Sequence, residues 1–186
     1  MTDAELMGFL KKGESEAFDE LHARYSKQLL GYFIRMLNYN KAKAQDALHD
    51  LFLKVVEKPE MFDGSKKFRS WIYTVAHNIC RNLYKHDQIV REAMDNFKMT
   101  ESGFDENFFA KAAAKMDASV FKETLKNILY DLPAEKKASF ILRYQEDHSI
   151  AEIAEIMNCE QGTVKSRIHY TLKILSEKLK EFNPQN

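Results

Sequence analysis

The sequence has little of what marks a secreted, membrane-spanning or strand-rich protein. Only two cysteines are present, Cys80 and Cys159, which are too few for a disulfide framework, so both are expected to be reduced. No apolar run approaches the roughly 20 residues that cross a bilayer, and the first residues are acidic, unlike a basic secretory leader. With 6 Gly and 3 Pro, the residues that punctuate strands are scarce. These absences favour a helical, cytoplasmic protein without direct membrane insertion.

The chain also lacks net charge, since 28 basic residues balance 28 acidic ones. The overall basic charge of many nucleic-acid-binding proteins is therefore missing. The distribution is uneven, however: residues 63–91 hold six cations against two acids, which leaves +4, and residues 161–186 hold five against two, which leaves +3. Residues 92–123 hold four cations against seven acids, which leaves −3. Residues 135–160 hold three cations against six acids, which again leaves −3. Two basic blocks thus alternate with two acidic ones, although ordinary surface scatter explains the charges equally well.

Apolar periodicity predicts where the helices lie. Hydrophobic residues recur every three or four positions at about 16–38, within 43–59 up to Pro59, and from Phe68 to about Leu83. The periodicity weakens at 89–120 and resumes at Leu125. The sequence therefore predicts an all-α fold of two small helical domains. Their expected limits are residues 1–88 and 121–186, joined by a flexible linker at 89–120.

Residues 149–175 have the spacing of a helix-turn-helix. Ser149 and Glu152 predict a capping box at the start of a helix that runs to about Met157. Asn158 suits the left-handed backbone conformation of a tight turn, and a second helix is predicted to begin near Gln161. In this motif the second helix enters the major groove of DNA, whereas a plain helical hairpin with solvated charges is the alternative. The residues expected to face the core are Val164, Ile168, Leu172 and Leu175, and those expected to face DNA are Gly162, Lys165, Ser166, Arg167 and His169.

Catalytic and metal sites are not indicated. The sequence has no glycine-rich phosphate loop and no nucleophile motif. His77 and Cys80 are three residues apart on one predicted helix, but two ligands are too few for a structural zinc site. We therefore expect no enzymatic activity, no cofactor, no metal and no small-molecule substrate. The remaining histidines are predicted to lie on the surface or to face DNA: His22, His49, His86, His148 and His169.

Both halves of the chain resemble regions of bacterial sigma factors. The segments "AFDELHARYSKQLLGYF", "AQDALHDLFLKV" and "FDGSKKFRSWIYTVAHNICRNLYKHD" are similar to region 2. The segment "LPAEKKASFILRY" and the later "SIAEIAEIMNCEQGTVKSRIHYTLKIL" are similar to region 4. Their order is that of the sigma-70 family, and the resemblance is greatest to its extracytoplasmic-function (ECF) group. It implies that the first domain binds RNA polymerase core and melts the minus-10 promoter element, and that the second reads the minus-35 element.

The resemblance also implies residue roles and partners. One helix would dock on the clamp helices of the largest polymerase subunit through Asp46, Asp50, Leu51 and Phe52. The pocket for a base flipped from the non-template strand would be lined by Phe62 and Asn78. The expected partners are RNA polymerase core, promoter DNA and a cognate anti-sigma factor. Phosphates would be contacted by Lys66, Lys67, Arg69, Arg81 and Lys85, and the minus-35 duplex by Gln161, Gly162, Thr163, Lys165, Ser166, Arg167, His169 and Tyr170.

Two other classes of protein remain open from the residues alone. A conventional transcription regulator would join a helical sensing domain to the helix-turn-helix and would bind duplex DNA by itself. A helical adaptor or anti-sigma protein would bind polymerase or a sigma factor without promoter DNA. The acidic linker is expected to thread a basic channel of polymerase, which is a hypothesis that depends on the charge of −3 counted over residues 92–123.

Overall fold

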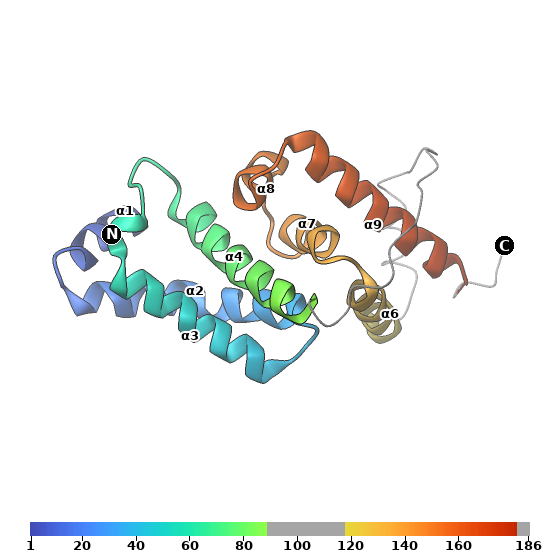
Figure 1. Cartoon of the computed structure of the whole chain (residues 1–186), viewed down its shortest axis with the longest axis horizontal. Coiled ribbons are helices and arrows are strands. Elements are labelled where there is room, and N and C mark those ends of the chain that lie inside the picture. Colours follow the sequence, from blue (N-terminus) through green and yellow to red (C-terminus); the bar gives the residue numbers. More distant parts are fainter. Residues whose placement is uncertain (89–117, 182–186) are drawn as a thin grey trace.

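A computed structural model describes residues 1–88 and 118–181, with side chains for 1–85 and 118–178 (Figure 1). The linker expected at 89–120 lies outside these residues except for its last three, which begin a helix. All regular elements of the described residues are helical, which confirms the predicted fold class. They are α1 (Asp3–Leu10), α2 (Ser15–Met36), α3 (Lys41–Glu57), a 3-10 turn η1 (Pro59–Met61), α4 (Phe68–Gln88), α6 (Ala118–Asp131), α7 (Ala134–Tyr144), α8 (Ile150–Met157) and α9 (Gln161–Glu181).

The first unit consists of α1 to α4, and α2 is at its centre. The apolar stripe predicted for this helix is buried, with Leu21, Leu29 and Phe33 fully shielded from solvent. Helices α1, α3 and α4 all contact α2. The side chain of Asn40 caps α3 by accepting a 3.0 Å hydrogen bond from the Lys43 backbone N–H, and α3 ends two residues before Pro59. The core of this unit is therefore built on the spacing that the sequence displays.

Helix α1 was not predicted from periodicity. Its start is a capping box in which the Thr2 side chain and the Glu5 carboxylate satisfy each other's backbone N–H groups. Leu6 and Met7 are fully buried against α2. A stretch of eight helical residues is too short to display a period, so the capping pair was its only clear sequence signal.

The second unit consists of α6 to α9. Pro133 directly precedes α7, and the apolar run within this helix, Phe140 to Leu142, is fully buried. Helix α9 contacts α6, α7 and α8. Its predicted core residues are all buried, with exposed fractions of 5% or less: Val164, Ile168, Leu172 and Leu175.

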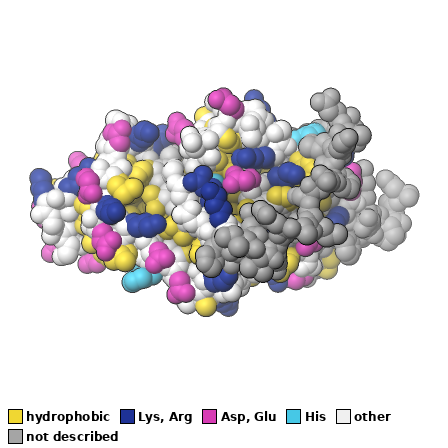
Figure 2. All heavy atoms as spheres, in the orientation of Figure 1, with side chains coloured by type: hydrophobic (Ala, Val, Ile, Leu, Met, Phe, Trp, Pro, Cys, Tyr) yellow, Lys and Arg dark blue, Asp and Glu magenta, His cyan; other side chains and the backbone are white. Residues whose placement is uncertain are grey.

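The two units lie against each other. Helix α8 runs beside α4, and α7 contacts both α2 and α4 (Figure 1). On the face of the molecule shown in Figure 2, basic and acidic side chains are intermingled over the described surface. The polar side of α4 is thus partly covered by the second unit, which bears directly on the predicted DNA-binding residues.

Candidate nucleic-acid interface

The helix-turn-helix forms as the sequence predicts. The Ser149 hydroxyl accepts a hydrogen bond from the Glu152 N–H at 3.2 Å, and the Glu152 carboxylate accepts one from the Ser149 N–H at 3.0 Å. The hydrogen bond from the Ser149 N–H, together with those from the Lys67 ammonium and the Ser149 hydroxyl, lowers the pKa of Glu152 to about 2. Asn158 ends α8 in the left-handed region, with φ 49°, and α9 begins three residues later. The capping box and the turn together fix the direction in which α9 leaves α8.

The start of α9 presents a polar surface. Gln161, Gly162, Lys165 and Ser166 are exposed, and Thr163 and His169 are half-buried. Because the buried positions of α9 fix its rotation, these six side chains lie on the faces that do not contact the core. Backbone N–H groups at a helix start favour anions, so the surface suits DNA phosphates.

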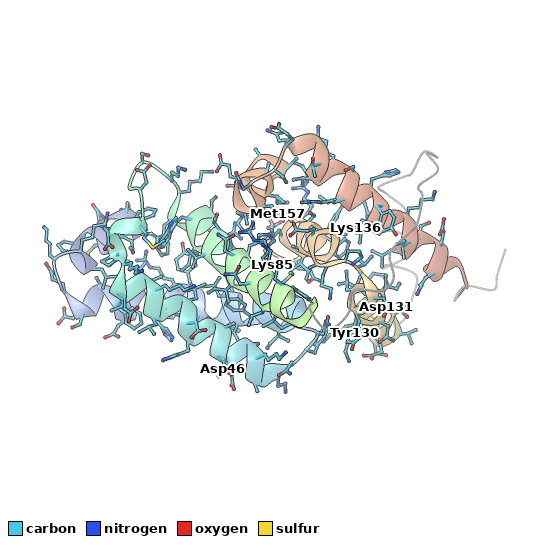
Figure 3. All side chains as sticks on the ribbon, in the orientation of Figure 1. Asp46, Lys85, Tyr130, Asp131, Lys136 and Met157 are labelled. Atoms are coloured by element: carbon cyan, nitrogen blue, oxygen red, sulfur yellow. The ribbon has the colours of Figure 1, made fainter. Side chains whose placement is uncertain are left out.

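Arg167 and Tyr170 lie closer to α7. One guanidinium nitrogen of Arg167 is 3.3 Å from the Glu135 carboxylate and 3.6 Å from the sulfur of Cys159. The Lys136 ammonium lies 3.5 Å from the centre of the Tyr170 ring, and this lysine extends from α7 toward α9 (Figure 3). The two residues therefore help to pack α9 against α7. Their predicted contacts with DNA stay predictions.

The loop before α4 is anchored by an aromatic cluster. Phe62 is 2% exposed, and its ring centre is 5.4 Å from that of Phe68 and 5.3 Å from that of Trp71. The Phe62 carbonyl also accepts a 3.0 Å hydrogen bond from Lys11. Phe62 is thus a core residue here rather than the exposed pocket wall expected from the resemblance. The apolar residue that this loop exposes is its neighbour Met61, which is 58% exposed.

The other predicted minus-10 residues, five for phosphates and Asn78 for the base pocket, fall into two groups by exposure. Lys66, Lys67, Arg81 and Lys85 are exposed, whereas Arg69 and Asn78 are half-buried. The Lys67 ammonium lies 3.1 Å from the Glu152 carboxylate of α8, and Arg69 donates a hydrogen bond to the backbone carbonyl of Glu146. The second unit therefore engages two of the cations that the sequence assigned to DNA.

Helix α3 separates into a buried face and an exposed face. Asp46 and Asp50 are exposed, and Asp46 lies on the outer edge of α3, away from the second unit (Figure 3). The expectation that Leu51 and Phe52 contact polymerase needs correction, because they are 0% and 4% exposed and belong to the core. The exposed apolar residues of α3 are instead Leu53 and Val56, at 45% and 44%. The sequence could have indicated that Leu53 is exposed, because it follows Asp46 by seven residues and therefore lies on the same helix face as that carboxylate.

One histidine departs from its predicted surface position, and a second is buried as well. His148 is 0% exposed beside Tyr73 of α4, and His77 of α4 is 3% exposed, with the Glu135 carboxylate of α7 3.9 Å from its ring nitrogen. Burial lowers the pKa of both imidazoles, and that of His148 falls to about 4. Among the described residues no three histidine, cysteine or acidic side chains gather closely enough to hold a metal ion. Within the same residues no helix combines the length and apolar character of a membrane span.

Comparison with known families matches both units. The family described as Sigma-70 region 2 matches residues 21–88, and that described as Sigma-70, region 4 matches residues 122–175. The chain belongs to the sigma-70 family, in the ECF group of RNA polymerase sigma factors. The helix-turn-helix of this sigma factor accordingly lies in its region 4, and α3 and α4 lie in its region 2.

Individual relatives extend over nearly the whole sigma factor. It is 27% identical over 186 residues to the ECF RNA polymerase sigma-E factor of Haemophilus influenzae, covering 96% of each chain. It is 28% identical to the ECF RNA polymerase sigma factor SigW of Bacillus subtilis, covering 92% of this chain and 94% of the relative.

Solved structures share the fold. CnrH in complex with the cytosolic domain of CnrY matches with a TM-score of 0.69 and 19% identity, covering 97% of this chain and 99% of the solved chain. The sigma factor RpoE in complex with the anti-sigma factor NepR from Bartonella quintana matches with a TM-score of 0.64 and 21% identity, covering 88% and 96%.

Proposed function

We propose that this sigma factor directs promoter-specific initiation by dividing three tasks between its two units. The first unit binds RNA polymerase core and opens the minus-10 element, and the second reads the minus-35 element. The single observation that carries this division is the order of the two family matches, region 2 over residues 21–88 and region 4 over 122–175. Recognition comes from this chain, and polymerase performs the chemistry of RNA synthesis.

Minus-35 recognition is assigned to the exposed start of α9. Gln161, Lys165 and Ser166 offer an amide, an ammonium and a hydroxyl within two turns, which suits base edges and phosphates in the major groove. A good bidentate base contact contributes about 1–3 kcal/mol of discrimination. Gly162, which has nothing within 4 Å of an added Cβ, leaves the helix start unobstructed.

Minus-10 opening is assigned to α4 and the loop before it. Flipping a base out of the stack costs a few kcal/mol, which hydrogen bonds to its exposed edge offset. The amide of Asn78 has the donor and acceptor that such an edge requires. The cations expected to hold the adjacent phosphates are Lys66, Lys67, Arg69, Arg81 and Lys85.

Polymerase docking is assigned to the exposed face of α3. Asp46 and Asp50 supply negative charge, and Leu53 and Val56 supply apolar area beside it. An apolar centre with a charged rim is the usual composition of a specific protein interface. Leu51 and Phe52 would act from within the core by holding α3 in place.

The partners and limits of the chain follow from the same proposal. The domains are residues 1–88 and 121–186, with the linker at 89–120 between them. The solved Bartonella relative is bound to an anti-sigma factor, and we extend a cognate anti-sigma partner to this chain. Because the proposed partners are polymerase and promoter DNA, we also propose that the chain acts in the cytoplasm.

Run-off transcription tests the proposal. Purified chain is added to core polymerase on a fragment library of the genome that encodes it, and new transcript starts are mapped. We expect starts that require the chain and share two upstream motifs. A conventional regulator would instead bind duplex DNA without polymerase, and an adaptor would bind polymerase without creating new starts.

A further inference from the structure

Glu146, in the α7–α8 turn (residues 145–149), contacts the first unit with both its side chain and its backbone. Its carboxylate accepts hydrogen bonds from the Arg35 guanidinium of α2 and from the Tyr73 hydroxyl of α4. Its backbone carbonyl accepts one from the Arg69 guanidinium of α4. Glu146 is 6% exposed, and burial raises its pKa while the donors act in the opposite direction. Three donors of the first unit therefore converge on one residue of the second.

Three further contacts hold the same interface. The Lys137 ammonium of α7 donates a 2.6 Å hydrogen bond to the Asn38 side chain after α2, and Lys67 pairs with Glu152 at 3.1 Å. The edge of the His148 ring meets the Tyr73 ring at 4.6 Å between centres. Polar contacts at several points thus fix the angle between the units.

The interface is suited to opening. Both ring nitrogens of His77 and of His148 are buried without a hydrogen-bond partner among the described residues, as is the side-chain oxygen of Gln145. Buried polar groups without partners favour an arrangement in which water reaches them. The contacts at Glu146 therefore favour the closed arrangement of the units, whereas the unpartnered polar groups favour an open arrangement in which water reaches them.

The contact partly covers Arg69, which the proposed function needs. Arg69, Tyr73 and His77 are spaced four apart, so they form one stripe of α4, and α8 with its preceding turn lies against it. The Arg69 guanidinium is held by Glu146 and lies 5.9 Å from the Tyr73 ring centre. In this arrangement the half-buried Arg69 already donates to Glu146, which hinders a contact with phosphate.

We infer that the α7–α8 turn is an internal latch: Glu146 holds the second unit over α4 in the free chain and must withdraw before promoter single strand reaches Arg69. The inference deepens the proposed function and rests on it for the identity of the ligand. The latch itself is a property of the free chain and is measurable without DNA.

The Lys67 and Glu152 pair allows the latch to be measured directly. A carbodiimide joins an amine to a carboxylate only when they are in contact, so the cross-linked Lys67–Glu152 peptide, quantified by mass spectrometry, reports closure. We expect Glu146→Lys to reduce this peptide by roughly tenfold or more, because it places a cation among two guanidinium groups. Glu155→Lys is the matched control, since Glu155 is exposed on α8 and undergoes the same charge change.

A second variant tests whether unfolding, rather than loss of the latch, explains a lower yield of the cross-linked peptide. Tyr73→Phe removes only the hydroxyl that donates to Glu146 and should reduce the peptide in the same direction, with unchanged helical circular dichroism. Equal peptide yields in the native chain, Glu146→Lys and Tyr73→Phe would overturn the latch.

A transcription assay distinguishes failure of the latch proposal from failure of the proposed function. On a promoter identified by run-off transcription, Glu146→Lys should require several-fold less chain than the native protein for half-maximal transcript, and Glu155→Lys the same amount. An unchanged or higher requirement would overturn the latch. Absence of any chain-dependent transcript would overturn the proposed function, whereas the cross-link result would still decide whether the latch exists.

Discussion

The ammonium of Lys137 lies 2.6 Å from the side-chain oxygen of Asn38, so a cation of the second unit is held by the first. Lys137 is 1% exposed, and burial lowers the pKa of its amine to about 8. A lysine with this pKa loses its proton near pH 8, so its contribution to the free energy of unfolding changes with pH above that value.

Lys137 should give the free energy of unfolding a measurable slope with pH. Between about pH 8 and 10 the unfolded chain keeps a proton on this amine that the native chain releases, so this amine alone contributes a rise in stability of about 3 kcal/mol at most. Burial raises the pKa of the Cys80 thiol and the Tyr73 hydroxyl, which act in the opposite direction, so the test is the difference between proteins. Over this range the free energy of unfolding, measured with urea, should change more positively with pH in the native chain than in Lys137→Met, and Lys122→Met, at an exposed position of α6, should match the native chain. Equal slopes for all three proteins would contradict the assignment.

The exposed face of α3 predicts the effect of a charge on polymerase binding. Leu53→Asp should weaken binding of the chain to core polymerase by roughly tenfold or more, because it places a charge in the apolar centre of the proposed interface. Its thermal stability should be unchanged, since Leu53 is 45% exposed. Titration of fluorescent chain with core polymerase measures the affinity. Ala23→Asp, on an exposed position of α2, adds the same charge and should bind normally.

The start of α9 predicts a salt-dependent change in promoter binding. Lys165→Ala should weaken binding of the chain and polymerase complex to duplex promoter and lower the slope of log affinity against log salt by ~1, if Lys165 contacts one phosphate. Filter binding at several salt concentrations measures both. Lys178→Ala removes the same charge near the opposite end of the helix and should leave the slope unchanged. A slope lost equally in both variants would argue for a general charge effect.

The turn of the helix-turn-helix predicts an unusual order of stabilities. Asn158 has φ 49° and ψ 56°, a conformation that costs residues with a side chain about 1–2 kcal/mol but costs glycine little. Asn158→Gly should therefore be at least as stable as the native chain, and Asn158→Ala less stable by about 1 kcal/mol. At Asn127, within α6, the order should reverse, because glycine is about 1 kcal/mol worse than alanine inside a helix. Chemical denaturation of the four variants measures these differences.

Local patterns in the sequence predicted the helix-turn-helix well. Ser149, Glu152 and Asn158 act through neighbours in the chain, so their capping and turn conformations could be derived from residue order alone. The buried positions of α9 followed from a regular apolar spacing. The ends of these helices and the exposed face of α9 could therefore be predicted from short-range chemistry.

Long-range contacts were not accessible in the same way. His148 has the composition of a surface turn around it, yet it is fully buried because Tyr73, 75 residues earlier in the chain, lies against its ring. The position of Phe62 likewise depends on Phe68 and Trp71 folding back over the loop. Glu146 gave no sequence signal, since its partners are contributed by two helices of the other unit.

The first turn of α9 remains open to solvent in the same arrangement that covers Arg69. If both helices bind DNA as proposed, the chain on polymerase can meet intact double helix through α9 before Glu146 withdraws, but it binds a melted strand only after its two units separate. Binding to duplex promoter DNA would then come before binding to the melted strand, and a closed molecule would not bind single-stranded DNA that opens transiently elsewhere in the genome.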